Sequence, residues 1–387
     1  MALLRVAFTI DSLKLGGAER VLLTWARWCR DAGWQVLVIT RQGAERDAYA
    51  LPEGVQRRVE PGLPPTLERL GWFAFPYRVW TLRRLLQEER CELVVGVTTL
   101  PAIKLLLACR GLAIRTLVSE RNYPPAKPPA LPWRWLRRLT YPRADLHLVQ
   151  TDTTGRWLSR HCAVRRQLLL PNPVVWPLPD REPVLDPELW IKPEQPLLLA
   201  VGTKAHQKGF DRLIPVFAAL ARRDPTLHLA LPGLAPGLYH GLDQQAWLRE
   251  LLGPDPDLQR RLLLPGVCGS MARWYERATV FVLPSRFEGF PNVLLEAMAA
   301  GCACIASDCL TGPRDLICDG DNGVLLPAEA SGSDWIAAVG DLLGDPDRRR
   351  RFGERAAAVR EGFAEQRLRH DFLEALSSLQ RSSLHHG

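Results

Sequence analysis

Residues 281–327 read FVLPSRFEGFPNVLLEAMAAGCACIASDCLTGPRDLICDGDNGVLLP and predict one strand–loop–helix unit of an α/β fold. Residues 280–283 are β-branched, aromatic or aliphatic, which is typical of a short buried strand. A loop over 284–291 follows, and residues 292–300 are good helix formers that end at Gly301. In parallel α/β sheets, ligands bind outside the carboxyl ends of the strands, where such a loop lies.

Two glutamates flank this junction. Glu288 lies in the loop, and Glu296 lies about one turn into the helix. The first N–H groups of the helix have no internal partner and carry partial positive charge, so they can receive a phosphate while the carboxylates bind hydroxyl groups. A phosphate beside a polyol describes a nucleotide sugar. The predicted phosphate-binding residues after Glu288 are Gly289, Phe290, Pro291, Asn292 and Val293.

The same alternation of apolar and helical stretches runs through the rest of the chain. Uniformly apolar strands separated by helices indicate a parallel sheet that is covered on both faces. We therefore predict an α/β fold of two doubly wound, Rossmann-like sheets facing a central cleft. The predicted strands are 4–10, 35–39, 93–97, 116–119 and 146–150, then 197–201, 227–231, 261–264, 279–283 and 303–307.

The chain of 387 residues is long enough for two domains of similar size. A proline-rich linker over 176–196 separates a predicted Rossmann-like domain over 1–175 from a second one over 197–362. The tail over 363–387 reads as a helix.

The composition limits the partners and the compartment. A formal net charge of +8 implies an acidic partner, but no zinc-finger spacing or aromatic RNA-binding motif accompanies it, so we expect no nucleic acid. Nine cysteines without a C-x-x-C pair favour reduced packing residues over disulfides or zinc. We see no signal-peptide pattern and no apolar run of about 20 residues, so we expect a cytoplasmic protein.

The pattern S-x-x-E-G-F-P-x-x-x-L-E-A-M-A-x-G, with seven residues between Glu288 and Glu296, resembles the signature of retaining glycosyltransferases of family 4. These enzymes have the GT-B fold, in which the last helix crosses back onto the first domain. Further family motifs follow one another along nearly the whole chain. They are GGAERV at 16–21, SERN at 119–122, LPNP at 170–173 and QKGFD at 207–211.

The resemblance implies a donor side and an acceptor side. Lys208 would neutralise the donor diphosphate, Glu288 would orient the sugar hydroxyls, and Glu296 would bind the ribose. Glu120 and Arg121 end an apolar strand, and Glu120 joins Glu288 and Lys208 as an expected catalytic residue; a surface salt bridge is the alternative for Glu120 and Arg121. The expected donor-binding residues are Gly202, Thr203, Lys204, Lys208, Val267, Glu288, Gly289, Phe290, Pro291, Asn292, Val293 and Glu296. The expected acceptor-binding residues are Gly16, Gly17, Arg121 and Asn122.

The chain departs from the family pattern at Thr203, where an arginine usually accompanies the lysine equivalent to Lys208. Lys204 is adjacent and is the candidate replacement, although a lysine does not reproduce the bidentate phosphate contact of an arginine.

Three D-x-D patterns resemble the metal motif of other glycosyltransferases. Asp255 and Asp345 each precede a proline at a predicted helix start, and residues 319–321 form a turn. We interpret all three as structural, and we expect neither a metal nor a cofactor beyond the nucleotide-sugar substrate.

Residues 132–139, PWRWLRRL, predict an amphipathic helix that suits an anionic membrane surface. Between Lys104 and Arg143, nine basic residues face one acid, Glu120. A helix docked on the core by its apolar face is the alternative. The predicted apolar arc of about 160° holds Pro132, Trp133, Trp135, Leu136 and Leu139, opposite Arg134, Arg137 and Arg138.

Together these features predict a retaining hexosyltransferase. It would move a sugar from a nucleotide sugar, most simply a UDP-sugar, to a glycan or lipid-linked acceptor in the synthesis of cell-surface polysaccharide or glycolipid. Two alternatives stay open: a nucleotide-sugar epimerase of the same fold, and a noncatalytic sugar- or lipid-binding relic suggested by Thr203. Measuring UDP release with and without acceptor separates the epimerase from the transferase. Nucleotide binding tests the noncatalytic relic, which should bind none.

Overall fold

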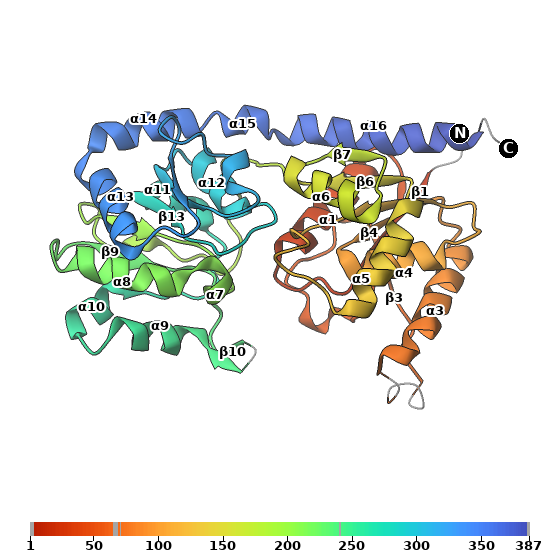
Figure 1. Ribbon diagram of the computed structural model, residues 1–387, viewed down its shortest axis with the longest axis horizontal. Helices are drawn as coiled ribbons and strands as arrows, with labels where there is room; N and C mark the ends of the chain where they lie inside the picture. Colours follow the sequence, from red (N-terminus) through yellow and green to blue (C-terminus); the bar gives the residue numbers. More distant parts are fainter. Residues whose placement is uncertain (1–3, 65–68, 70, 240, 385–387) are drawn as a thin grey trace. The chain divides into compact units, whose positions relative to one another are not determined.

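The computed structural model describes residues 4–64, 69, 71–239 and 241–384. The chain divides into two compact units, one formed by Met1–Asn172 with Gln366–Gly387 and the other by Pro173–Glu365. Each unit contains a parallel sheet with helices on both faces (Figure 1). The predicted pair of doubly wound α/β sheets is confirmed.

The first unit has a seven-stranded parallel sheet in the order β3-β2-β1-β4-β5-β6-β7. The chain runs outward from β1 through β2 to β3, then returns to β4 on the other side of β1, as in dinucleotide-binding folds. The strands are β1 (Arg5–Ile10), β2 (Gln35–Thr40), β3 (Gln56–Val59), β4 (Leu93–Val97), β5 (Arg115–Ser119), β6 (Leu146–Val149) and β7 (Gln167–Leu169). The helices are α1 (Gly17–Asp31), α3 (Phe75–Glu88), α4 (Thr99–Ala108), α5 (Leu131–Thr140), α6 (Asp152–Cys162) and α16 (Glu365–Leu384), with 3-10 turns η1 (Ala44–Arg46), η2 (Gly71–Ala74) and η3 (Tyr141–Arg143).

Helix α16 packs against α1 through aromatic side chains. Phe372 of α16 stacks on Trp25 with ring centroids 5.1 Å apart and lies tilted against Trp28 at 5.9 Å. Aromatic pairs of this kind contribute about 0.5–1.5 kcal/mol beyond the burial of their area. The last helix is thus part of the first unit's core, although it follows the second unit in sequence.

The second unit has a six-stranded parallel sheet in the order β12-β9-β8-β13-β14-β15 and a separate β10-β11 hairpin. The strands are β8 (Leu197–Leu199), β9 (His228–Ala230), β10 (Leu238–Tyr239), β11 (Leu242–Asp243), β12 (Leu262–Leu263), β13 (Val280–Leu283), β14 (Cys304–Asp308) and β15 (Val324–Pro327). The helices are α7 (Ala205–Lys208), α8 (Phe210–Ala221), α9 (Gln244–Leu252), α10 (Pro256–Arg261), α11 (Met271–Arg277), α12 (Asn292–Ala299), α13 (Gly332–Gly344), α14 (Pro346–Ala356) and α15 (Val359–Gly362), with 3-10 turns η4 (Pro187–Leu189) and η5 (Pro313–Asp315).

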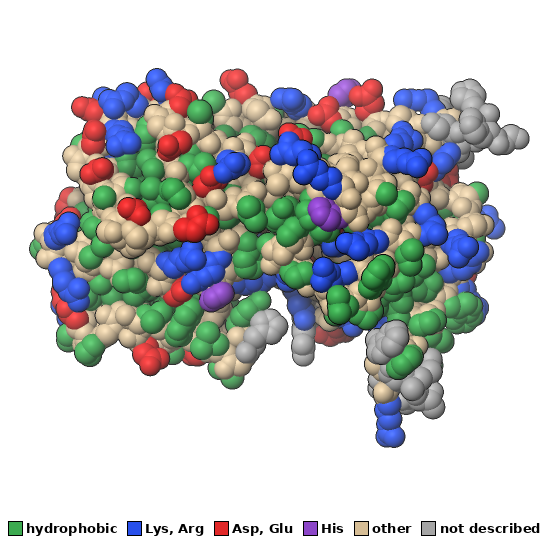
Figure 2. All heavy atoms as spheres, viewed as in Figure 1, with side chains coloured by type: hydrophobic (Ala, Val, Ile, Leu, Met, Phe, Trp, Pro, Cys, Tyr) green, Lys and Arg blue, Asp and Glu red, His purple; other side chains and the backbone are tan. Residues whose placement is uncertain are grey.

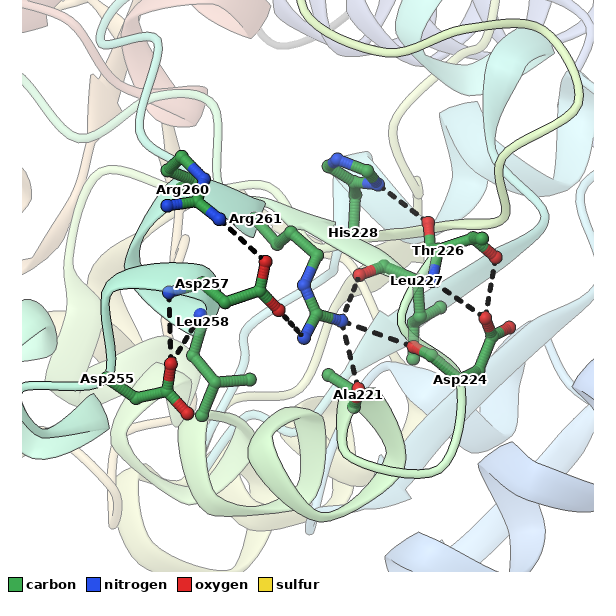
Figure 3. Close-up of polar contacts among 10 residues, drawn as sticks. All are labelled: Ala221, Asp224, Thr226, Leu227, His228, Asp255, Asp257, Leu258, Arg260 and Arg261. Atoms are coloured by element: carbon green, nitrogen blue, oxygen red, sulfur yellow. Dashed lines mark hydrogen bonds and ion pairs between the residues drawn. The ribbon is translucent and has the colours of Figure 1, made fainter.

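A buried arginine fixes the outer part of this second sheet (Figure 3). Arg261 donates through Nη2 to Asp257 at 2.5 Å. Its Nη1 reaches the carbonyl oxygens of Ala221, Asp224 and Leu227 at 3.0, 3.2 and 3.3 Å. One guanidinium therefore satisfies carbonyls at the end of α8 and in the turn before β9, which have no helical partner. The Arg261 contacts are structural.

Residues 176–196, which we predicted to be a linker, lie within the second unit. Ile191 is buried in its core. The carbonyl oxygen of Leu185 accepts two hydrogen bonds. Trp274 of α11 donates one at 2.9 Å, and Ser270, the residue before α11, donates the other at 2.7 Å. The prolines limit regular structure here to the 3-10 turn η4, but they do not prevent packing.

The predicted basic excess of residues 104–143 overstates the surface charge. Lys104 is buried and its Nζ lies 2.5 and 2.7 Å from the carboxylate oxygens of Glu60, outside that stretch. Arg121 and Arg137 are also buried. Only the cations that stay exposed contribute to the field at the surface.

Candidate active site

The second sheet has its topological switch point at β8. The chain leaves β8 for β9 on one side and later returns to β13 on the other side. The loops at the carboxyl ends of β8 and β13 therefore diverge, and the crevice between such loops is where doubly wound sheets bind ligands. The loop after β8 leads through α7 to Lys208, and the loop after β13 carries Glu288.

Lys208 and Glu288 form an ion pair at this point. Nζ of Lys208 lies 2.8 Å from Oε1 of Glu288, and Oγ of Ser285 donates to the same oxygen at 2.6 Å. No hydrogen bond from the described part of the chain reaches Oε2 of Glu288. The two side chains are only 14% and 6% exposed, so water screens their attraction less than on an open surface. The pair orients Lys208 and leaves one carboxylate oxygen able to accept a hydrogen bond.

Two glycines allow the pair to form. A Cβ on Gly202 would lie 2.6 Å from Cγ of Lys208, so the lysine side chain passes directly over this backbone. Gly209 has a φ of +69°, and a Cβ there would lie 2.0 Å from the carbonyl oxygen of Pro284. Helix α7 therefore ends in a left-handed residue packed against the loop after β13, and a side chain would push the two loops apart.

Hydroxyl groups hold the rest of the loop and the second glutamate. Oγ1 of Thr311 donates to the backbone carbonyl oxygen of Glu288 at 2.5 Å. The hydroxyl of Tyr275 donates to Oε2 of Glu296, which is buried in α12, at 2.9 Å. The predicted phosphate-binding residues Gly289, Phe290, Pro291, Asn292 and Val293 occupy the end of the loop and the start of α12.

The loop after β8 carries Thr203 and Lys204. Gln244 of α9 fixes this loop, because its amide donates to the carbonyl oxygen of Thr203 at 3.2 Å and accepts from the N–H of Ala205 at 2.7 Å. Lys204 is half-buried, and its side chain makes no hydrogen bond or ion pair with any residue that the structure describes. Its ammonium group is therefore available to a ligand. Val267 lies in the loop between β12 and α11.

Glu120 directly follows β5 in the first unit and is 2% exposed. Thr99 Oγ1 lies 2.9 and 3.1 Å from its two oxygens, and the hydroxyl of Tyr141 donates to Oε2 at 2.8 Å. Burial raises the pKa of Glu120, and the charge of Arg137 and the hydroxyl hydrogen bonds act against this rise. The alternative of a surface salt bridge for Glu120 and Arg121 is wrong, because both side chains are buried.

Arg121 contacts Trp25 of α1 and Asn172, the residue at which the first segment of this unit ends. Its guanidinium lies 5.3 Å over the ring of Trp25 and donates to Oδ1 of Asn172. Burial lowers the pKa of Arg121 to about 9, and the charge of Glu19 acts against this shift. The other predicted acceptor-binding residues are Gly16 and Gly17, at the start of α1, and Asn122, which is exposed.

Two of the three D-x-D patterns contain helix caps. Asp255 accepts from the N–H groups of Asp257 and Leu258 at 3.0 and 3.3 Å, and Asp345 accepts from that of Arg348 at 2.8 Å. These bonds satisfy the free N–H groups of α10 and α14. Within residues 4–64, 69, 71–239 and 241–384, no group of three or more His, Cys, Asp or Glu could hold a metal ion.

The structure assembles the predicted residues in two places, one in each unit. Lys208 meets Glu288 in the second unit, and Glu120 stands beside Arg121 in the first. Sequence reasoning missed the hydroxyl side chains that hold the glutamates. Ser285 belongs to the S-x-x-E motif, so its spacing could have revealed it. The others, which come from distant segments without a local signal, are Thr99, Tyr141, Tyr275 and Thr311.

Two family models match the chain. The model described as Glycosyl transferases group 1 matches residues 183–359, and the model described as Glycosyltransferase Family 4 matches residues 15–175. The first match contains Lys208 and Glu288, and the second contains Glu120.

Two relatives extend the comparison. The chain is 34% identical over 194 residues to D-inositol 3-phosphate glycosyltransferase of Nocardia farcinica; this alignment covers 49% of the chain and 42% of the relative. It is 24% identical over 381 residues to the N-acetylgalactosamine-N,N'-diacetylbacillosaminyl-diphospho-undecaprenol 4-alpha-N-acetylgalactosaminyltransferase of Campylobacter jejuni, with 96% and 99% covered. The chain thus spans less than half of the first relative and nearly all of the second.

Solved structures share the fold. The sucrose-phosphate synthase of Thermosynechococcus elongatus matches with a TM-score of 0.82 and 19% identity, over 98% of this chain and 100% of that chain. The Anabaena protein HepE, solved in complex with UDP-glucose, matches with a TM-score of 0.73 and 17% identity, over 97% and 99%. At these identities the likeness shows the fold, which is GT-B. The chain is therefore similar to glycosyltransferases over residues 15–175 and 183–359, and it has the GT-B fold.

Proposed function

We propose that the protein is a retaining glycosyltransferase that transfers a sugar from a UDP-sugar to a glycan or lipid-linked acceptor. One observation carries this proposal. The ion pair of Lys208 and Glu288 lies at the switch point of the second sheet and offers a cation and a carboxylate oxygen to which no described residue donates a hydrogen bond. The cation suits the negative charge of a diphosphate, and the carboxylate oxygen suits a hydrogen bond from a sugar hydroxyl.

The donor roles follow from the contacts of each side chain. Lys208 would approach the diphosphate while Ser285 keeps hold of Glu288, and Oε2 of Glu288 would accept from a sugar hydroxyl. Lys204, whose ammonium group is available, would supply the second cation that Thr203 lacks. The carboxylate of Glu296, oriented by its bond from Tyr275, would bind the ribose hydroxyls.

The reaction would break the bond between the anomeric carbon and the diphosphate oxygen. The acceptor hydroxyl oxygen would form a bond to the same face of that carbon, and its proton would pass to the departing UDP. Negative charge grows on the diphosphate as the bond breaks, so Lys208 stabilises the transition state more than the bound donor. We name no protein nucleophile and no metal.

The acceptor side belongs to the first unit. Arg121, Asn122, Gly16 and Gly17 stand near the carboxyl ends of β5 and β1, which is where a doubly wound sheet binds ligands. The burial of Glu120 and its bonds to hydroxyl groups favour a role in positioning this loop rather than contact with the substrate. The similarity to a transferase named for an undecaprenol diphosphate acceptor supports a lipid-linked glycan, and the HepE complex supports a uridine nucleotide.

The test is product analysis with a panel of UDP-sugars, with and without lipid diphosphate-linked glycan acceptors. We expect UDP to appear only with both substrates, and NMR of the product to show the anomeric configuration of the donor. An inverted product would overturn retention. UDP released together with a free epimerised sugar, without any acceptor, would instead identify the epimerase.

A further inference from the structure

Helix α5 presents a row of apolar side chains to solvent. Leu131, Trp135 and Leu139 are spaced by four residues and are 64%, 64% and 60% exposed. Residues four apart lie on one face of a helix, so these three side chains form a continuous row. Figure 2 shows hydrophobic side chains gathered over this part of the first unit. A contiguous exposed apolar patch marks an interaction site, whereas scattered exposed apolar residues do not.

The exposed row shares only Trp135 and Leu139 with the arc that the sequence predicted. Trp133 and Leu136 are partly buried and pack on the core, and the ring of Trp133 meets Phe75 edge-on at 4.6 Å. Arg137, predicted on the polar side, is buried with its guanidinium 4.8 Å over the ring of Trp157 in α6. The predicted apolar arc is therefore divided: Trp133 and Leu136 face the core, whereas Trp135 and Leu139 are exposed.

Helix α6, next to α5, lines a basic groove of about 460 Å³ that extends to β7. Arg156, Arg160 and Arg165 line this groove and are exposed. None of the three forms an ion pair with any residue that the structure describes, and Asp152 is the acid in the lining. Exposed guanidinium groups around a groove suit phosphate oxygens, which they bind in bidentate fashion.

The segment that supplies both features is strongly basic. Residues 121–172 contain ten Lys and Arg against two acids, Asp145 and Asp152. Asp145 already pairs with Arg115, outside the segment, at 2.8 Å. Arg121 and Arg137 are buried, and the remaining Lys and Arg of the segment are exposed. The surface around the apolar row therefore carries a positive field with little internal compensation (Figure 2).

We propose that the row of Leu131, Trp135 and Leu139, together with the arginines of the α6 groove, docks on an anionic lipid bilayer. The apolar row would enter the interface between headgroups and acyl chains, and the arginines would bind lipid phosphates. No described helix is both long and apolar enough to span a bilayer, so α5 would lie on the surface. This proposal depends on the proposed function in one respect: a lipid-linked acceptor lies at a membrane surface.

Charge selects this occupant over a second copy of the chain. A symmetric dimer through α5 would bring two sets of arginines together, and like charges repel. A soluble polyanion would satisfy the arginines but would leave Leu131 and Leu139 in water. An anionic bilayer accommodates both features at once.

The experiment is cosedimentation of the full chain with phosphatidylcholine vesicles, with and without phosphatidylglycerol. We expect binding only to the anionic vesicles, with release as added salt shortens the screening length. Replacing Arg156, Arg160 and Arg165 with Gln should weaken partition on the order of a hundredfold, since each cation near the surface contributes about 1 kcal/mol. Leu131→Ser, Trp135→Ser and Leu139→Ser together should weaken it roughly tenfold or more.

Two matched controls change the same chemistry elsewhere. Replacing the exposed Arg222, Arg223 and Arg351 with Gln removes the same charge from the second unit. Replacing the exposed Leu189, Leu238 and Leu251 with Ser removes apolar surface from that unit. Both controls should bind vesicles like the wild type. Thermal unfolding of each variant shows that it is folded.

Several outcomes would overturn the proposal. They are a wild type that ignores anionic vesicles at low salt, an apolar-row variant that binds as well as the wild type, and an arginine control that loses binding equally. A concentration-dependent dimer that disappears in the apolar-row variant, without vesicles, would assign the row to a second copy. Vesicle binding requires no nucleotide, so a protein that binds vesicles but not UDP would refute the proposed function and leave this inference standing.

Discussion

Glu288 in the second unit and Glu120 in the first occupy similar positions, but their surroundings differ. Each stands in the loop that follows a strand of a parallel sheet, and they are 5% and 2% exposed. Glu288 pairs with the cation of Lys208 and keeps one oxygen free of protein partners among the described residues. Both oxygens of Glu120 accept from hydroxyl groups, and no ion pair with Arg137 forms. A buried carboxylate thus serves a ligand only where the fold leaves part of it unsatisfied.

The same substitution at the two positions gives the largest expected contrast. Glu288→Gln removes the charge that orients Lys208. We expect a loss of about 3 kcal/mol of transition-state stabilisation, so that kcat/KM falls on the order of a hundredfold. Glu120→Gln keeps an acceptor oxygen for Thr99 and Tyr141, and we expect turnover within about threefold of the wild type. Steady-state kinetics on the two purified variants measures both effects. Equal losses would end the distinction.

The fold was largely predictable because its strands are continuous apolar runs. The edge strands β3, β7 and β15 and the β10-β11 hairpin were missed; β15 is apolar in sequence, whereas the others are polar or very short. β3 reads QRRV and is mostly exposed, β7 has three residues, and β15 is only half-buried at the sheet edge. Edge strands pair on one side only, so their sequences need not be apolar.

The second expected effect concerns the missing arginine near Lys208. We expect Lys204→Ala to raise the donor KM by about tenfold, because this ammonium group has no partner among the described residues and would bind the diphosphate. Thr203→Arg should lower the donor KM, since it restores a bidentate phosphate contact. Initial rates at varied donor concentration give both values. An unchanged KM in Lys204→Ala would remove Lys204 from the site.

The donor side was easier to predict than the surroundings of Glu120. Lys208 and Glu288 each lie in a local motif, and the sheet order brings those motifs together at the switch point. The burial of Glu120 depends on Thr99 and Tyr141, each about twenty residues away in sequence. Such contacts are fixed by tertiary packing, and neither periodicity nor composition reveals them.

Each of the two glutamates Glu120 and Glu296 accepts a hydrogen bond from a tyrosine hydroxyl. Tyr141→Phe removes the hydroxyl that donates to Glu120, and Tyr275→Phe removes the one that donates to Glu296. Each variant should lose about 1 kcal/mol of unfolding free energy. Only Tyr275→Phe should also raise the donor KM, because Glu296 would bind the ribose. Denaturant titration and initial rates separate the two effects, and a raised KM in Tyr141→Phe would contradict the assignment.

The smallest expected effect is a change in the pH dependence of stability. Because burial raises the pKa of Glu120, the folded state binds its proton more tightly than the unfolded state does. The resulting stabilisation is present at low pH and is lost as pH rises from the ordinary carboxyl range through the raised pKa. Gln does not titrate, so the Tm of Glu120→Gln should rise relative to the Tm of the wild type as pH increases through this window.

A neighbouring histidine acts in the opposite direction. Burial lowers the pKa of His147, whose ring lies 5.2 Å from that of Tyr141, to about 4, so its protonation destabilises the fold as pH falls below its ordinary range. Both proteins carry His147, so the difference in Tm between them isolates Glu120. A difference that does not change with pH would show that Glu120 titrates normally.

We propose that Lys208, paired with Glu288, binds the diphosphate of a uridine nucleotide. Calorimetric titration of UDP and of uridine into the wild type, Lys208→Ala and the exposed control Lys192→Ala tests it most directly. We expect UDP to bind the wild type and the control equally and Lys208→Ala on the order of a hundredfold more weakly, whereas uridine, which has no diphosphate, should not distinguish the three. If Lys208→Ala binds UDP as tightly as the wild type, Lys208 does not bind the diphosphate.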